Sequence, residues 1–410
     1  MELIYSKIGD LCNVSSSKRV FAKQYVEEGI PFYRQKEIID KKNGNALEEP
    51  IFISEPDYNE LKEKSGVPED GDLLLTAVGA TLGIPYVVGD EKFYFKDGNL
   101  IWLNNFSNAL NSEFLYYWID SSFGTQTLWN RTIGSAQPAL TIDSIKKLSI
   151  PIPSREIQDK ITKTLKTYDA LIANNNKRIR LLEQMAENLY KEWFVRFRFP
   201  GYESAEFENG IPVEWEYVKL GDILSFERGI SYSSEEIDCD EGLNLINLKN
   251  IDAFGGFRRD GTKMYNGKYK ESQVVKTGDL VIGVTDMTQD RRTVGAAALI
   301  PTIEGISVIS ADLVKVVSDV PNIYLYSLCR YGFYSKYFSQ FANGANVLHL
   351  KPGTLLNKKL LLPTKELIDA FVEKAAATIE LIDGLNIAND NLIRQRNLLL
   401  PRLMSGKLEV

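Results

Sequence analysis

Histidine and cysteine are scarce in this sequence of 410 residues. His349 is the only histidine, which nearly excludes zinc sites and acid–base catalysis that depend on imidazole. The cysteines are Cys12, Cys239 and Cys329, and because they are odd in number and far apart they exclude a disulfide framework and a CxxC metal site. We therefore predict that the chain holds no metal ion.

Long hydrophobic runs and the signature motifs of enzymes are missing too. No apolar run reaches the ~18–20 residues of a membrane span, and the N-terminus lacks the apolar core of a signal peptide, so we expect a cytoplasmic protein without membrane contact. The patterns GxxxxGK[ST], GxGxxG after a strand and [DNS]PP[YFW] do not occur. The sequence therefore predicts no catalytic residues and no cofactor, and a self-contained nuclease or methylase is the weakest hypothesis.

Proline and glycine are absent between Ser154 and Phe199. The chain has a net charge of −7, which argues mildly against nonspecific coating of nucleic acid, yet residues 154–198 contain ten basic and six acidic side chains. Apolar residues recur there at steps of three, four or seven, which predicts an amphipathic helix that ends at Pro200-Gly201. About 45 residues with a rise of 1.5 Å each would make a helix of ~70 Å. A helix of that length needs a partner.

The partner is a second apolar stripe near the end of the chain, and it reveals a duplication. The segment that precedes the first stripe, Pro153-Ser154-Arg155-Glu156, aligns with Pro363-Thr364-Lys365-Glu366 at an offset of 210 residues. Farther upstream, Ile8-Gly9-Asp10-Leu11 matches Leu220-Gly221-Asp222-Ile223 at an offset of 212. We interpret the chain as one unit written twice, each unit being a globular domain followed by a long helix.

Each globular part has a mixed pattern that predicts an α+β fold. Short β-rich runs, such as Leu73–Thr76 and Leu313–Val317, alternate with turn signals, and one amphipathic helix per unit is expected, at Ser112–Asp120 and at Ile323–Phe338. The expected architecture is two tandem globular domains separated by two long antiparallel helices that form a pseudo-two-fold internal repeat. The predicted boundaries are 1–153 and 201–363 for the globular domains, and 154–200 and 364–410 for the helices.

This duplicated plan fits two kinds of function. Two similar domains held apart by rigid helices could read a split site on duplex DNA, which has its own two-fold pseudosymmetry. The alternative is an elongated scaffold that does not bind DNA and whose duplicated domains bind proteins. Geometry alone leaves both hypotheses open.

Specific motifs add a family resemblance. The first copy contains GDLCNVSSS, EDGDLLLTAVGATLG, GSAQPALTIDSIKKLSIPIPSREIQDKI and LLEQMAENLYKEWF in that order, and the second contains LGDILSFERG, KTGDLVIGVTDMTQDRRTVGAAALIP and RQRNLLLPRLMSGKLEV. In this order and in duplicate they resemble the specificity subunit, HsdS, of type I restriction-modification systems, over nearly the whole chain. The second copy departs from the pattern at Ala345–Pro363, which lacks the GSAQ of the first.

The resemblance implies a non-catalytic subunit of an adenine-N6 DNA methyltransferase and restriction endonuclease. Each globular domain would be a target-recognition domain that reads one half of an asymmetric bipartite DNA site. The long helices would act as a spacer and dock two methyltransferase (HsdM) subunits, which use S-adenosylmethionine. Restriction and translocase (HsdR) subunits, which use ATP and Mg²⁺, would complete the restriction enzyme.

Base edges in the major groove are read by polar and basic side chains on loops held by a rigid scaffold, and glycines allow backbone to approach phosphate. The candidates in the first unit are Arg34, Gln35, Lys36, Thr76, Gly79, Thr81, Arg131, Ser135 and Gln137. The candidates in the second unit are Asn247, Lys249, Asn250, Thr285, Asp286, Thr288, Gln289, Arg291, Arg292, Asn343 and Asn346. Arg291-Arg292 is the strongest candidate for a phosphate or guanine contact, and its alternative interpretation is a solvated surface pair.

Asparagines occur near the middle of both predicted helices. Asn175 and Asn386 are candidates for a buried pair that fixes helix register at some cost in stability. A polar face that contacts the methyltransferase or solvent is the alternative interpretation of these residues.

Overall fold

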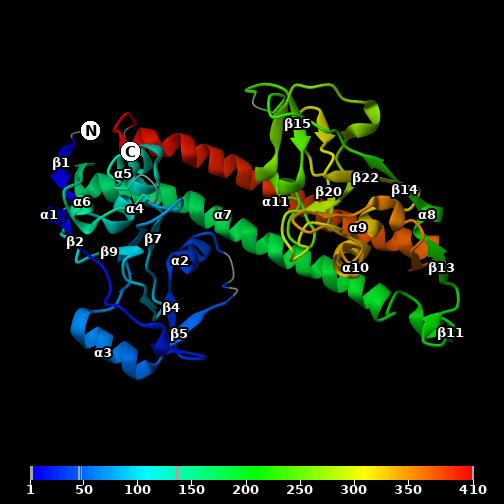
Figure 1. Cartoon of the computed structure of the whole chain (residues 1–410), viewed down its shortest axis with the longest axis horizontal. Coiled ribbons are helices and arrows are strands. Elements are labelled where there is room, and N and C mark those ends of the chain that lie inside the picture. Colours follow the sequence, from blue (N-terminus) through cyan, green and yellow to red (C-terminus); the bar gives the residue numbers. More distant parts are fainter. Residues whose placement is uncertain (1–2, 45–46, 48, 135–137, 238, 409–410) are drawn as a thin grey trace. The chain divides into compact units, whose positions relative to one another are not determined.

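The computed structural model describes the chain except residues 1–2, 45–46, 48, 135–137, 238 and 409–410. The chain divides into two compact units (Figure 1). Unit 1 comprises residues 1–174 and 389–410, and unit 2 comprises residues 175–388. Each unit mixes sheets and helices, so the α+β prediction is confirmed.

Unit 1 contains two four-stranded sheets and one pair of strands. The first sheet has the order β2 (Asn13–Ser15), β9 (Leu100–Asn104), β6 (Leu73–Thr76) and β7 (Pro85–Val87), with antiparallel neighbours. The second has the order β3 (Tyr25–Val26), β5 (Ile51–Ile53), β4 (Ile30–Tyr33) and β8 (Tyr94–Phe95), and β4 and β8 are parallel. The separate pair is β1 (Ile4–Lys7) with β10 (Ser149–Ile152).

The helices of unit 1 cover these sheets. They are α1 (Ile8–Leu11), α2 (Gln35–Lys42), α3 (Glu55–Ser65), α4 (Ser112–Asp120), α5 (Ser122–Trp129) and α6 (Ile142–Lys146). Helix α4 begins where the Asn111 side chain accepts hydrogen bonds from the next backbone N–H groups, and it buries Phe114 and Trp118 in the main core. This core also contains Leu73 and Leu103 of the first sheet.

Unit 2 repeats this plan. One sheet has the order β14 (Leu224–Arg228), β22 (Leu313–Ser318), β18 (Leu280–Gly283) and β20 (Ala297–Leu299). The other has the order β16 (Lys263–Tyr265), β15 (Leu243–Ile246), β21 (Ser307–Ile309) and β17 (Val274–Val275), and β15 and β21 are parallel. The paired strands are β13 (Glu216–Lys219) with β24 (Lys359–Leu362), β11 (Phe207–Glu208) with β12 (Ile211–Pro212), and β19 (Thr285–Asp286) with β23 (Leu348–His349). The helices are α8 (Leu220–Ile223), α9 (Asn322–Tyr331) and α10 (Tyr334–Ser339).

Matching strand orders confirm the duplication at the level of topology. The first sheets agree strand for strand, and in the second sheets β5-β4-β8 of unit 1 corresponds to β16-β15-β21 of unit 2. The units differ at the edge strand, because β3 adds beside β5 whereas β17 adds beside β21. The outer edge of a sheet is therefore less constrained by the repeat than its centre.

Two long helices confirm the central prediction of the sequence. Helix α7 spans Arg155–Tyr190 and continues as a π-helical segment over Lys191–Val195, and α11 spans Lys365–Met404 with Pro401 in its last turn. Within unit 1, Ile161 and Leu165 of α7 pack in one core with Leu400 and Met404 of α11. Because Asp169, farther along α7, contacts Arg396, earlier on α11, the two helices run antiparallel in this unit.

Unit 2 contains the other halves of the same helices. Tyr190 and Phe194 of α7 contact the ring of Phe371 of α11, with ring centroids 5.9 and 5.0 Å apart. Among the residues that the structure describes, none of the helices has an apolar stretch of membrane-spanning length.

The predicted single helix over Ile323–Phe338 is wrong. The structure has two helices there, α9 and α10, separated at Gly332 and Phe333. A Cβ on Gly332 would lie 2.8 Å from the Tyr190 hydroxyl, and Phe333 has a left-handed backbone with φ of 63°. Tyr190 of α7 therefore packs against the glycine that follows α9, and the left-handed backbone of Phe333 separates α9 from α10.

Candidate nucleic-acid interface

One irregular loop of unit 2, residues 284–296 between β18 and β20, carries six of the predicted contact residues. Its anchor is Asp286, a buried carboxylate. One oxygen accepts hydrogen bonds from the Thr288 N–H and hydroxyl, both at 2.8 Å, and the other accepts from the Thr293 N–H at 2.7 Å. Burial alone would raise the pKa of Asp286, but the bonds from Thr293 and Thr288 outweigh it and lower the pKa. Asp286 thus fixes both ends of the loop.

The anchored loop exposes the side chains between its two ends. Thr288, Gln289 and Arg292 are exposed, and Arg291 is half-buried with a left-handed backbone at φ of 56°. The Arg291 guanidinium donates to the Ser339 carbonyl at 2.8 Å, which ties the loop to α10. Thr285 lies at the base of the loop, where its buried hydroxyl donates to Asp312 at 2.9 Å.

The segment 343–349 lies against this loop. Strand β23 pairs with β19, and Gln289 donates through its amide to the Ala345 carbonyl at 2.9 Å. Asn343 and Asn346 are both exposed in this segment. The structure therefore brings together two predicted groups that are far apart in the sequence, the loop after β18 and the turn before β23.

Asn247 and Asn250 lie elsewhere in unit 2 and are buried. The Asn247 amide donates to the Gly261 carbonyl at 2.8 Å, and the Asn250 amide donates to the Arg258 carbonyl at 2.9 Å. These bonds hold a turn together, and Lys249 between them is exposed. The turn thus presents one basic side chain on a framework of buried asparagines.

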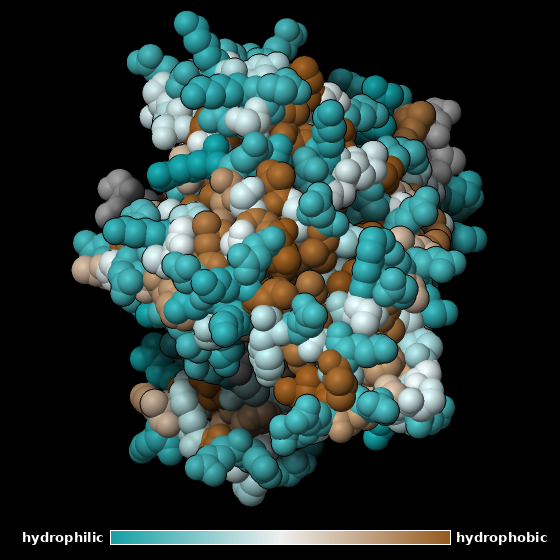
Figure 2. All heavy atoms as spheres, turned by 90° about the vertical axis from the view of Figure 1, so that its right-hand side faces the viewer, coloured by the Kyte–Doolittle hydropathy of each residue, from teal (hydrophilic) through white to brown (hydrophobic). Residues whose placement is uncertain are grey.

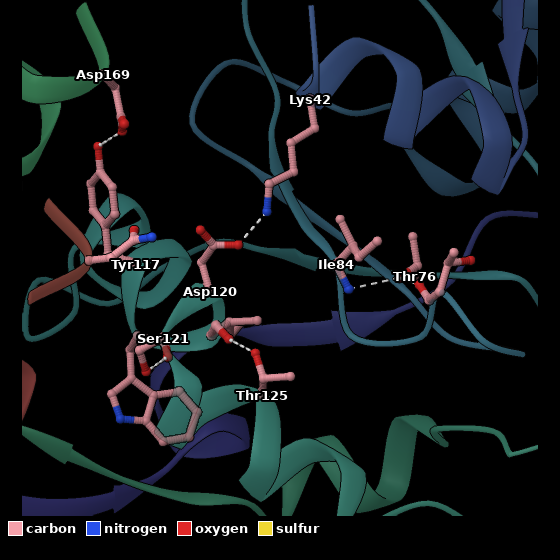
Figure 3. A network of polar contacts seen from close by, with 12 residues as sticks. Lys42, Thr76, Ile84, Tyr117, Asp120, Ser121, Thr125 and Asp169 are labelled. Carbon is pink, nitrogen blue, oxygen red and sulfur yellow. Dashed lines mark hydrogen bonds and ion pairs between the residues drawn. The ribbon is translucent and has the colours of Figure 1, made fainter. Parts of the chain in front are cut away.

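The corresponding loop of unit 1, residues 77–84 between β6 and β7, is shorter and is held by different chemistry. The buried Thr76 hydroxyl donates to the Thr81 carbonyl at 2.6 Å and accepts from the Ile84 N–H at 2.8 Å (Figure 3). The Gln35 amide donates to the Val78 carbonyl at 2.9 Å and to the Thr81 hydroxyl at 2.6 Å. Several predicted residues of unit 1 therefore meet at this loop.

The remaining predictions for unit 1 fall around it. Gly79 has φ of 74°, and its N–H donates to the Pro138 carbonyl at 3.0 Å. Arg34 pairs with the buried Glu37, whereas Lys36 and Arg131 are exposed. Ser135 and Gln137 lie outside the described residues.

The two predicted register residues lie in the long helices. Asn175 is in α7 and Asn386 is in α11, both half-buried and both in unit 2. Within the described residues no group of three or more His, Cys, Asp or Glu side chains could hold a metal ion.

Polar clamps that the sequence did not suggest join helices within each unit. In unit 1 the Tyr117 hydroxyl of α4 donates to Asp169 of α7 at 2.5 Å (Figure 3). Arg396 of α11 donates to the other carboxylate oxygen at 2.5 Å. In unit 2 Arg330 of α9 donates to Glu183 of α7 at 3.1 Å. The charges were visible in the sequence, but no local pattern indicated that they would meet.

Unit 2 also exposes apolar side chains. The face that carries α8 and β13 shows them gathered in a patch (Figure 2). Val195, Phe207, Val213 and Tyr217 are exposed in this part of the chain, at 47%, 43%, 52% and 62%. A surface of this kind suits contact with another protein.

The chain is similar to known proteins over most of its length. Residues 3–184 match the family described as the type I restriction modification DNA specificity domain. The relatives that the chain matches are specificity subunits of type I restriction enzymes. It is 27% identical over 313 residues to the MjaIX specificity subunit of Methanocaldococcus jannaschii, covering 73% of this chain and 69% of that protein. It is 23% identical over 369 residues to the MjaVIII specificity subunit of the same organism, covering 86% of this chain and 83% of that protein.

The fold agrees with a solved specificity subunit. The crystal structure of the type I restriction-modification S subunit from M. genitalium aligns with a TM-score of 0.59 at 13% identity, covering 98% of this chain and 96% of that one. This likeness concerns the fold: the two proteins align over both units of this chain, although few of their residues are identical.

Proposed function

We propose that this chain is a specificity subunit that reads an asymmetric bipartite site on duplex DNA, one unit per half-site. The observation that carries the proposal is the duplicated loop: each unit places an irregular, anchored loop between equivalent strands of the same sheet, after β6 and after β18. Loops on a rigid scaffold are where proteins place side chains that read bases. The different residues of the two loops support two different half-sites.

The proposed contacts are exposed or half-buried residues around these loops and on the turn that holds Lys249. They are Gln35, Lys36, Thr81 and Arg131 in unit 1, and Lys249, Thr288, Gln289, Arg291, Arg292, Asn343 and Asn346 in unit 2. Thr76, Asn247, Asn250, Thr285 and Asp286 are buried and bonded to the protein, so we assign them the role of holding the loops. Buried polar groups that already form hydrogen bonds within the protein have few donors or acceptors available for a DNA base.

The long helices are proposed to dock two methyltransferase subunits and to set the gap between the half-sites. Exposed apolar residues support docking: Leu171 and Leu398 in unit 1, and Leu181, Met185 and Leu381 in unit 2. The chain would contribute recognition without catalysis. The methyltransferase would bind S-adenosylmethionine, restriction subunits would use ATP and Mg²⁺, and the complex would work in the cytoplasm.

The test is a base-resolution map of N6-methyladenine in cells that express this chain with its methyltransferase. A single motif of two short halves around a fixed gap is expected. If the complex assembles and methylates but no motif emerges, the proposal fails and the protein-binding scaffold is the better interpretation.

The spacer role has its own experiment. Inserting two helical turns, about seven residues, into both α7 and α11 should lengthen the unspecified gap and leave each half-site unchanged. A gap of unchanged length, from a variant that still assembles and methylates, would contradict the spacer role.

A further inference from the structure

We propose that unit 2 contains a pocket for one backbone phosphate of the DNA, formed between the loop 284–296 and helix α10. The inference rests on the proposed function and adds a ligand class and residues, Ser335 and Lys336, that none of the motifs indicated. The pocket would position the loop on the duplex, because phosphate contacts fix register while base contacts read sequence.

The pocket is a small cavity of about 160 Å³. Arg291, Arg292 and Asp290 line it from the loop, and Ser335 and Lys336 line it from α10. Pockets for drug-sized molecules usually exceed ~300 Å³, so this cavity suits a small group with a few waters. A phosphodiester is such a group.

Ser335 is the observation that points to a ligand. Its side chain is 5% exposed, and its hydroxyl has no hydrogen-bond partner among the described residues. A buried hydroxyl without a partner costs free energy, so native structures rarely keep one without a reason. Rotation about a single side-chain bond redirects this hydroxyl, and an anionic oxygen in the cavity would accept a hydrogen bond from it.

The charge of the cavity favours an anion. Arg291, Arg292 and Lys336 contribute three cations, and the carboxylate of Asp290 lies 3.3 Å from Arg292 and offsets one of them. Arg291 uses one N–H for the Ser339 carbonyl, and a guanidinium has five N–H donors, so others can serve a ligand. Donors of this kind form short, strong bonds to phosphate oxygens.

The cavity walls are held in place before any ligand arrives. Asp286 fixes the loop ends, and Gly295, at φ of 79°, packs so closely on α10 that a Cβ there would lie 2.7 Å from the Ser335 carbonyl. Arg291 adopts a left-handed backbone, which a non-glycine residue keeps only when its surroundings enforce it. Preorganised donors lose less entropy on binding than flexible ones.

The sequence positions of unit 1 that match this pocket carry no cations. Its shorter loop, residues 77–84, contains no Lys or Arg, and at the 210-residue offset Thr125 and Gln126 stand where unit 2 has Ser335 and Lys336. The phosphate pocket should therefore act on the half-site that unit 2 reads and not on the other.

The experiment uses the complete methyltransferase complex and duplexes that carry the methylated motif. Neutral methylphosphonate linkages are placed one at a time along each half-site, and affinity is measured for wild type, Ser335→Ala, Lys336→Met and the control Lys268→Met. Lys268 is an exposed lysine of unit 2 that does not line the cavity. We expect one linkage in one half-site to weaken wild-type binding about threefold to tenfold, since each phosphate contact contributes a slope of about 0.9 to the salt dependence.

The variants test whether the phosphate at the sensitive linkage binds in the pocket. Ser335→Ala and Lys336→Met should weaken binding to unmodified DNA and lose no further affinity at the sensitive linkage, whereas Lys268→Met should behave as wild type. Additive losses in both pocket variants would overturn the inference. Lys336 is at the surface, so Lys336→Met remains informative if Ser335→Ala folds poorly.

Two other outcomes are distinguishable. If wild type does not prefer the motif to unrelated DNA, the proposed function itself fails. If methylphosphonates have no effect but inorganic phosphate slows amide exchange at residues 335–339 in wild type and not in Ser335→Ala, the pocket takes a free phosphate ion and the DNA part of the inference is overturned.

Discussion

The two units build the same helix junction from different side chains. In unit 1 the junction contains Ile161 and Leu165 from α7 and Leu400, Leu403 and Met404 from α11. At the 210-residue offset unit 2 has Phe371, Ala375, Tyr190, Trp193 and Phe194. Aliphatic packing has become aromatic, and Ala375 in place of Leu165 leaves room for the larger rings. The comparison teaches that the repeat preserves which positions are apolar, whereas the side chains at those positions differ.

The polar clamps differ more than the cores do. Unit 1 uses Tyr117, Asp169 and Arg396, whose counterparts in unit 2 are Ser327, Ile379 and Ala186. Unit 2 uses Arg330 and Glu183, whose counterparts in unit 1 are Asp120 and Ile393, and Asp120 instead pairs with Lys42 (Figure 3). Each unit therefore has its own way of fastening α7, although the helices are laid out alike.

The largest expected effect comes from breaking the aromatic junction. Phe371→Ala removes a ring that is fully buried among Tyr190, Trp193, Phe194 and Tyr324, and it should lower the unfolding free energy of unit 2 by about 3–5 kcal/mol. The matched variant in unit 1, Ile161→Ala, should cost less because fewer atoms are removed. Amide exchange resolved by unit is the measurement, and equal losses in the two units would contradict the comparison.

The clamps should be separable by single substitutions. Asp169→Ala leaves the Tyr117 hydroxyl and Arg396 without their shared acceptor, which should destabilise unit 1 by about 1–3 kcal/mol and spare unit 2. Glu183→Ala removes the carboxylate acceptor of Arg330, which keeps its bond to the Tyr326 hydroxyl, and it should destabilise unit 2 and spare unit 1. If either variant loosens both units equally in amide exchange, the clamps are not specific to their units.

A pH titration should separate the two loops. The folded pKa of Asp286 lies below its unfolded value of ~3.9, so its stabilisation is present above that value and is lost as the pH falls through the folded pKa. The unit 1 loop is anchored by Thr76, which does not titrate. Acid should therefore accelerate amide exchange at Thr293 relative to that at Ile84, after correction for intrinsic rates.

Asp286→Asn is the control for this titration. It should make exchange at Thr293 faster at neutral pH and remove the acid-dependent step. An acid response that persists unchanged in Asp286→Asn would assign the titration to another group.

The smallest expected effect concerns a single exposed cation in each unit. Arg292→Ala in unit 2 and Arg131→Ala in unit 1 should each reduce the salt slope of DNA binding by about 1 and leave methyltransferase assembly intact. Binding by the same complex at several salt concentrations is the measurement. A slope that does not change would remove that residue from the interface.

Much of the architecture could be predicted from the sequence because the patterns that indicate it are local or occur twice. The apolar stripe between Ser154 and Phe199 predicted α7, since helix periodicity and the absence of Pro and Gly act within a few turns. The 210-residue offset predicted two similar units. The runs Leu73–Thr76 and Leu313–Val317 became central strands for the same reason.

The burial and the hydrogen bonds of polar residues depend on the tertiary structure. Asp286, Asn247 and Thr76 looked like candidates for base contacts, but each is buried and holds its loop through bonds to residues that folding brings near. Gly332 lies against the Tyr190 hydroxyl of α7, and Ser335 lines one pocket with Arg291 because folding brings α10 to the loop. Helical and strand periodicity involves residues that are close in the sequence, so it can be read from the sequence. Burial and hydrogen bonding depend on residues that are distant in the sequence and become neighbours only on folding. A single sequence does not show which residues these are.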